Sequence, residues 1–196
     1  MIAGFLLYGL AWLSFGAGHS LLAGVRGRDW LVRRFGRAHR LVFNAIATVH
    51  ILAVAGVGWA LLGDSPPFAL PEPMTWAMHG LAGAGVVAFV LFLRSYDSGR
   101  LLGTAQMRGW GDDDDEPLRL SGPHRWVRHP LYVAGFMILW GRAHDPFGLA
   151  TALWGSAYLI VGTVFEERKL LARFGAAYAE YRRTVPMFLP RWPGRR

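Results

Sequence analysis

The amino-acid sequence predicts an all-α integral membrane protein with about five transmembrane helices, a C-terminal helical hairpin and a cytoplasmic amphipathic helix. Three observations predict this fold class. Hydrophobic residues make up 53% of the 196 residues, apolar runs recur at the length that a bilayer requires, and basic residues gather in alternate connections. The whole chain, 1–196, is interpreted as one domain with three N-terminal spans (1–93), a cytoplasmic loop (94–128), a helical hairpin (129–165) and a cytoplasmic tail (166–196).

Five apolar segments define the predicted helices. Three of them, 2–23, 41–62 and 76–93, have about the length of a membrane span, roughly 20 residues. The fourth, 130–140, is shorter, and the fifth covers 147–165. Only six residues, GRAHDP, join these last two segments. This short connection predicts a tight helical hairpin in the membrane.

Positive charge predicts the orientation of the chain. Twenty of the 21 Lys and Arg residues lie between spans one and two, between spans three and four, or after span five. The other connections hold Asp64, Glu72 and Asp145, with Arg142 as their single cation. Because cytoplasmic loops are enriched in Lys and Arg, we predict a cell-membrane protein whose N-terminus is outside and whose C-terminus is cytoplasmic.

Composition also excludes several kinds of site. Without cysteine, the chain cannot form a disulfide framework, a thiolate nucleophile or a zinc–thiolate site. The seven histidines show no spacing such as HExxH, so we predict no metal site. The acidic run 112–116 is interpreted as a solvated turn rather than a metal site. The net charge is +8, but the basic residues flank apolar segments and the sequence contains no nucleic-acid-binding motif. The expected partner is therefore membrane lipid, not nucleic acid.

The peptide Arg128-His129-Pro130-Leu131-Tyr132 opens the predicted hairpin. Proline is favoured in the first turn of a helix, which places His129 at or near the N-cap and Tyr132 in the first turn. A helix N-terminus attracts anions, and an adjacent arginine offers a fork for a carboxylate or phosphate. The peptide is therefore a candidate binding site. The alternative is an interfacial anchor, with arginine and tyrosine at headgroup level and histidine as a cap.

Glu166 and Glu167 directly follow the fifth span. Adjacent residues of a helix point about 100° apart, so one carboxylate can face inward while the other faces water. An inward carboxylate can accept hydrogen bonds from ribose hydroxyls or pair with an ammonium group. Acidic residues near a helix C-terminus oppose the macrodipole. This favours a functional role, whereas the alternative is a hydrophilic helix end paired with Lys169 and Arg173.

The cytoplasmic segments give further predictions. Between Arg168 and Arg183, apolar side chains recur at spacings of three and four. This pattern, with a basic polar face, predicts an amphipathic helix at the membrane surface that covers the opening between the last two spans. Tyr181 of this helix is a predicted substrate contact. In the loop before the hairpin, Asp97 and Gln106 are placed to face a substrate pocket or to cap the third helix.

Small and polar residues within the spans give weaker predictions. Gly83 and Gly85 allow close approach of a cofactor or, more often, of another helix. His19, in the first span, is interpreted as a substrate-binding residue or as an interhelical hydrogen-bond partner. For the polar side chains of the second span, Asn44 and His50, the alternatives are an interhelical hydrogen-bond partner and a catalytic residue.

Several motifs together resemble a known superfamily. RHPxY at 128–132, the acidic pair, and the pattern FGxxYxxYxxxVPxFLP at 174–190 resemble the integral-membrane methyltransferases. That group includes isoprenylcysteine carboxyl methyltransferase, phospholipid methyltransferases and methanethiol S-methyltransferase. HSLLA at 19–23 and RLLGTAQ at 100–106 are similar to its NnrU-like branch. One departure is Ala134, which stands where the family usually has glycine.

The resemblance implies S-adenosylmethionine as the methyl donor, bound at the cytoplasmic side between the hairpin and the tail helix. It implies a small apolar or amphiphilic methyl acceptor, namely a thiol, a carboxylate or a lipid amine. His129 or Glu167 would be the catalytic base for a thiol or amine, whereas a carboxylate acceptor needs none. The implied cofactor-binding residues are Arg128, His129, Pro130, Tyr132, Glu166 and Glu167 and, more loosely, Gly83 and Gly85.

Two other functions stay open from the sequence. The first is an NADPH-dependent membrane reductase of the sterol-reductase type, for which only Arg182 and Arg183 could hold the additional phosphate. The second is a non-enzymatic, NnrU-like membrane accessory protein. Binding of S-adenosylmethionine rather than NADPH would separate the methyltransferase from both.

Overall fold

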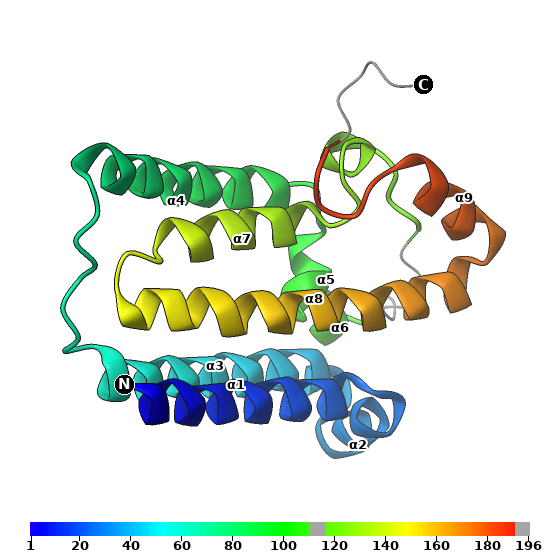
Figure 1. Ribbon diagram of the computed structural model, residues 1–196. Helices are drawn as coiled ribbons and strands as arrows, with labels where there is room; N and C mark the ends of the chain where they lie inside the picture. Colours follow the sequence, from blue (N-terminus) through cyan, green and yellow to red (C-terminus); the bar gives the residue numbers. More distant parts are fainter. Residues whose placement is uncertain (110–116, 191–196) are drawn as a thin grey trace.

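The computed structural model describes residues 1–109 and 117–190, and this part of the chain forms helices and no strands (Figure 1). The helices long and apolar enough to cross a membrane are α1 (Ile2–Ala23), the segment containing α3 (His39–Leu62), α4 (Glu72–Leu93) and α8 (Pro146–Phe174). A further apolar helix, α7 (Pro130–Gly141), has 12 residues and therefore spans about 18 Å. The predicted fold class is confirmed, and the chain is a multi-pass membrane protein.

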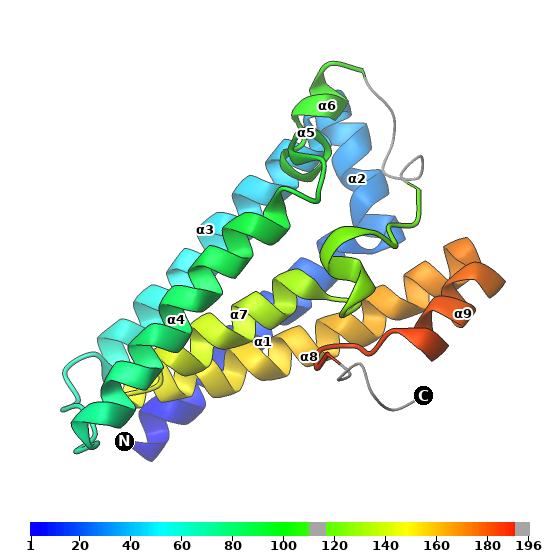
Figure 2. The ribbon, with the colours of Figure 1, turned by 90° about the horizontal axis from the view of Figure 1, so that it is seen from above.

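Shorter elements connect these helices. They are α2 (Val25–Phe35), the 3₁₀ turn η1 (Gly36–Ala38), α5 (Ser98–Leu102), α6 (Thr104–Met107), the 3₁₀ turn η3 (Gly122–Arg125) and α9 (Ala176–Thr184). All of them lie at one end of the bundle, opposite the connection between α3 and α4 (Figures 1 and 2). That end also carries most of the arginines, as the sequence predicts for the cytoplasmic side.

The long helices pack in two pairs around α8. Helices α1 and α3 lie side by side, α4 lies along α7, and α8 runs between the pairs (Figure 1). The core between α1, α3 and α8 is aromatic, with Tyr8 and Phe15 buried against Val54 and Leu62. Because the side chains on the opposite helix faces are exposed and apolar, as Leu13 is, the outer surface of the bundle suits lipid.

Local signals explain the α7–α8 hairpin. Pro146 begins α8, and the Asp145 side chain accepts a hydrogen bond from the Gly148 amide at 2.6 Å, which caps the helix. Across the hairpin turn, the Phe68 amide donates to the His144 carbonyl. This bond ties the turn to the α3–α4 connection, so both lie at the same end of the bundle. The predicted hairpin is confirmed.

The end of α8 differs from the prediction. The sequence predicts one amphipathic helix from Arg168 to Arg183, but α8 continues to Phe174 and α9 begins at Ala176. Gly175 separates them with a φ of +54°, in a region that glycine adopts at little cost. The predicted start of the tail helix is therefore wrong, because residues 168–174 extend the membrane helix.

Two predictions are not decided by the fold. The acidic run 112–116 lies outside the described residues. Which end of the bundle faces the cytoplasm stays a prediction, based on the distribution of Lys and Arg.

Candidate functional site

A buried carboxylate lies at the centre of the charged cluster. Glu167, on α8, has a side chain that is only 5% exposed. Its Oε1 accepts from Arg128 Nε at 2.7 Å and lies 3.1 Å from His129 Nε2, and its Oε2 lies 3.3 Å from Arg182 Nε. Since a buried charge is stable only when it is paired, the three basic groups account for the position of this acid. Residues from α8, from the start of α7 and from α9 therefore meet at one point.

The two residues before α7 are held in place by the tail. Pro130 is fully buried as the first residue of α7, and His129 takes the N-cap position, as predicted. The amide of Arg128 donates to the Pro186 carbonyl at 2.9 Å, and that of His129 donates to the Met187 carbonyl at 3.3 Å. The segment after α9 thus pairs with the segment before α7 and covers the cluster.

Arg128 directs most of its N–H donors to acceptors within the protein. Besides the bonds to Glu167, its Nη1 donates to the carbonyls of Val185 and Arg182 at the end of α9. These carbonyls belong to the last turn of α9 and the residue after it, where backbone acceptors lack helical partners. Its side chain is 7% exposed. The guanidinium of Arg128 therefore links α7, α8 and α9 and serves as a positioning group.

Glu166 is the accessible member of the acidic pair. Its side chain is 45% exposed, in contrast to the buried Glu167, so the predicted divergence of the two carboxylates is confirmed. The Tyr132 hydroxyl donates to Glu166 Oε2 at 2.7 Å. The His129 ring stacks on the Tyr132 ring, with centroids 5.4 Å apart and planes 11° apart. Glu166 is thus fixed in place while one side of its carboxylate stays open.

The hydrogen bonds of His129 indicate its tautomer. A carboxylate can only accept, so Nε2 carries a proton when it bonds to Glu167. Nδ1 lies 3.8 Å from Glu166 Oε2, beyond hydrogen-bond distance. In the neutral ring Nδ1 is therefore the nitrogen without a proton, and the carboxylates of Glu166 and Glu167 lie near the two ring nitrogens.

Two tyrosines of α9 close the cluster from the tail side. Tyr178 is buried, and burial together with the negative charge of Glu167 raises the pKa of its phenol. Burial raises the pKa of Tyr181 to about 12. The Tyr181 hydroxyl donates to the His124 carbonyl of η3 at 2.7 Å. Both phenols are therefore neutral at physiological pH, and the hydroxyl of Tyr181 is engaged by the protein backbone.

Other predicted site residues lie apart from this cluster. Gly85 packs against α7, where an added Cβ would approach the Ile138 amide nitrogen to 2.9 Å, whereas Gly83 has open space around it. Gln106 is buried on α6 and donates to the Arg100 carbonyl. The His19 ring contacts Phe43, and its Nδ1 lies 3.3 Å from the Tyr158 hydroxyl. For Gly85, Gln106 and His19 the contacts are those of the interhelical or local packing alternatives, and the roles of all four residues as cofactor or substrate contacts stay predictions.

Asp97, the other loop residue considered for a substrate pocket, caps a helix. Its Oδ1 accepts from the Arg100 amide at 3.0 Å. The helix that it caps is α5, however, not the preceding membrane helix, so only the kind of role was predicted correctly.

Three residues of the cluster were not among the predicted site residues. Arg182 completes the ion pairs of Glu167, and Tyr178 is buried beside Glu167. The Phe188 ring packs against the His129 ring, with the two ring centroids 6.0 Å apart. The signal for Tyr178 and Phe188 was present in the pattern FGxxYxxYxxxVPxFLP, whereas Arg182 occupies an unspecified position of that pattern. The departure at Ala134 is accommodated, since its methyl group is completely buried in α7.

The fold and this cluster define a multi-pass membrane protein with an ionic centre between a helical hairpin and its C-terminal tail. A family comparison identifies the group, because the NnrU protein family matches residues 6–146. The chain therefore belongs to the NnrU family. The matched region includes Arg128 and His129 but ends before Glu166 and Glu167. No solved structure matches the chain.

Curated proteins that resemble this chain carry the name methanethiol S-methyltransferase. Methanethiol S-methyltransferase 2 of Bradyrhizobium diazoefficiens is 45% identical over 74 residues, covering 37% of this chain and 29% of the relative. Methanethiol S-methyltransferase of Mycobacterium tuberculosis is 42% identical over 73 residues, covering 37% of this chain and 30% of the relative. A relative of the same name from a Pseudomonas species is 26% identical over 185 residues, covering 90% and 70%. The chain thus matches less than a third of the length of the first two relatives. These names support the resemblance to membrane methyltransferases.

Proposed function

We propose that this protein is an integral-membrane methyltransferase that moves a methyl group from S-adenosylmethionine to a small thiol or another small apolar or amphiphilic acceptor. The observation that carries the proposal is the junction of α7, α8 and α9 at Glu167, where a buried carboxylate meets three basic side chains. The relatives named methanethiol S-methyltransferase support a thiol acceptor.

The polar groups at the junction fit the charges of this cofactor. S-adenosylmethionine carries a carboxylate, an ammonium group, ribose hydroxyls and a sulfonium methyl that reacts with nucleophiles. Arg182 is 42% exposed, so its guanidinium can bond a carboxylate while Nε stays with Glu167. Glu166, also accessible, can accept hydrogen bonds from hydroxyl or ammonium groups. The half-exposed pair would therefore contact the cofactor, while Glu167 and Arg128 hold that pair in position.

The proton of a thiol acceptor would be taken by His129. A thiol attacks as its thiolate, and transfer forms a sulfur–carbon bond as the sulfonium–methyl bond breaks. Both oxygens of Glu167 are occupied by basic groups, so Glu167 is a poor proton acceptor. Nδ1 of His129 is the free basic atom, and Glu166, 3.8 Å away and open to solvent, can relay the proton. The geometry therefore favours His129 over Glu167 as the base.

Calorimetry of the detergent-purified protein tests the cofactor. We expect S-adenosylhomocysteine and S-adenosylmethionine to bind and NADPH not to bind. Glu166→Gln should lower the affinity for S-adenosylhomocysteine by roughly 10–100-fold, because a charge-assisted hydrogen bond contributes about 1.5–3 kcal/mol. Glu180→Gln is the matched control, since Glu180 is exposed on α9 and, among the described residues, forms an ion pair with Arg183 alone.

The acceptor is tested by activity with both substrates. Incubation with methanethiol and S-adenosylmethionine should give the methylated thioether, detected in the headspace by gas chromatography. His129→Asn should lower kcat by a far larger factor than it lowers the affinity for S-adenosylhomocysteine. Binding of NADPH without S-adenosylhomocysteine would instead support a reductase, and binding of neither would support a non-enzymatic accessory protein.

A further inference from the structure

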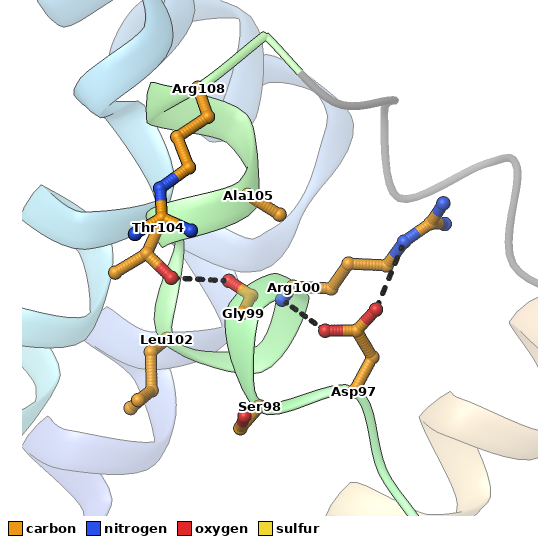
Figure 3. Close-up of a pocket in the computed structure, with 8 residues that line it drawn as sticks. All are labelled: Asp97, Ser98, Gly99, Arg100, Leu102, Thr104, Ala105 and Arg108. Atoms are coloured by element: carbon orange, nitrogen blue, oxygen red, sulfur yellow. Dashed lines mark hydrogen bonds and ion pairs between the residues drawn. The ribbon is translucent and has the colours of Figure 1, made fainter.

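A second polar site lies away from the Glu167 junction. A surface pocket of about 370 Å³ opens between α5 and α6 and shares no lining residue with the charged cluster (Figure 3). Two arginines, Arg100 and Arg108, line it together with the hydroxyl-bearing residues Ser98 and Thr104. The methyl-transfer site proposed above makes no use of these residues.

The pocket lies where the membrane helices end. Asn44, in the second turn of α3, donates to the Leu101 carbonyl of α5 at 2.9 Å. Gly103, with a φ of +93°, brings the α5–α6 turn so close to α3 that an added Cβ would lie 2.7 Å from the Leu41 amide nitrogen. Helix α4 ends at Leu93, five residues before α5 begins. The short helices are therefore pressed against the arginine-rich end of the spans, at the level expected for lipid headgroups.

Neither arginine has all of its donors paired within the described residues. Asp97 lies 3.7 Å from Arg100 Nε, but Arg100 Nη1 is buried and makes no hydrogen bond within the described residues. Arg108 is exposed, and no carboxylate of residues 1–109 or 117–190 lies within ion-pair distance of it. Figure 3 shows its side chain folded back toward Thr104. A third guanidinium, that of Arg37, lies next to Gly109.

The wall of the pocket is also apolar. Leu102 is 56% exposed and, with Ala105, lines the pocket beside the arginines. Guanidinium groups bind phosphate oxygens, whereas an exposed leucine at the membrane interface suits an acyl chain. A molecule that satisfies both surfaces has a phosphate headgroup joined to a hydrocarbon tail. We propose that this pocket binds the headgroup of an anionic phospholipid, whose acyl chains run along Leu102 into the bilayer.

Native mass spectrometry of the detergent-purified protein tests this site. Dioleoyl phosphatidylglycerol should be retained in preference to dioleoyl phosphatidylcholine. Arg100→Gln and Arg108→Gln should each lower the affinity for phosphatidylglycerol about fivefold, the effect of one basic residue at an anionic surface. Arg142→Gln, an exposed arginine in the opposite connection, is the control and should leave retention unchanged. Ala105→Trp fills the pocket without changing charge and should also reduce retention.

The outcomes distinguish the possible ligands. If a millimolar excess of inorganic phosphate displaces the lipid completely, the pocket binds free phosphate and the lipid assignment fails. Displacement by S-adenosylhomocysteine would make the pocket part of the cofactor site and would also overturn it. Equal retention of both lipids, or wild-type retention by the Ala105→Trp protein together with both arginine variants, would refute the proposal. None of these results depends on methyltransferase activity.

Discussion

Substitution of Glu167 by glutamine should destabilise the junction of α7, α8 and α9 by about 3 kcal/mol. The substitution keeps the shape of the side chain but leaves buried Arg128 without its counter-charge. Removing one partner of a buried ion pair costs about 3–5 kcal/mol. We expect the lower end, because Arg128 retains two backbone carbonyls and half-exposed Arg182 contributes little. For a chain of this size, that loss corresponds to a decrease in Tm of about 6–12 °C.

Thermal unfolding in detergent and limited trypsin digestion measure this effect. Glu166→Gln is the matched control. The carboxylate of Glu166 is half exposed, and the amide oxygen that replaces it can still accept a hydrogen bond from Tyr132. The control should change Tm by no more than about 1–3 °C, as expected for a surface interaction. In the Glu167 variant, trypsin should cut faster after Arg182 because the tail is released. Equal melting temperatures and equal cleavage rates for the two variants would show that Glu167 does not hold the tail.

Three further predictions follow from individual contacts. Gly85→Ala should destabilise the protein by about 1–3 kcal/mol because α7 lies against Gly85, whereas Gly83→Ala should be neutral. If the Gly85 variant instead kept its stability but lost S-adenosylhomocysteine binding, Gly85 would be a cofactor contact. Tyr181→Phe should cost about 1–3 kcal/mol of unfolding free energy, since it leaves a carbonyl unpaired, and a raised KM with normal stability would instead identify a substrate contact. In intact cells, an impermeant maleimide should label Asp64→Cys but not Thr184→Cys, and the reverse pattern would invert the predicted orientation.

The membrane helices could be predicted because their signal is local. A helix that faces lipid needs an apolar run of bilayer length, and this requirement is visible in composition alone. The predicted run 2–23 coincides with α1, and the predicted run 41–62 begins two residues after α3 does. The start of α7 was equally predictable, because Pro130 fits the first helical position and excludes an earlier start.

The pairings within the site were not predictable in the same way. Arg128 and Glu167 are 39 residues apart, and no periodicity relates them. The sequence showed that one carboxylate of the acidic pair could face inward but not which basic residues would meet it. The turn at Gly175 had a visible signal, a glycine after the basic residues of a helix, but the apolar spacing continued across it and favoured one helix.

The positions of the charged groups separate residues that organise the site from residues that can contact a ligand. Arg128 is the arginine of the RHPxY motif and was predicted to bind the cofactor. Its guanidinium bonds Glu167 and two carbonyls of the tail, and its role in cofactor binding stays a prediction. Its side chain is buried, so little of the guanidinium is open to a ligand. We therefore expect the direct contacts to come from Glu166 and Arg182, which are half exposed and already oriented by Tyr132 and Glu167. The tail therefore belongs to the site, because its packing over α7 supplies both the carbonyl acceptors for Arg128 and the side chain of Arg182.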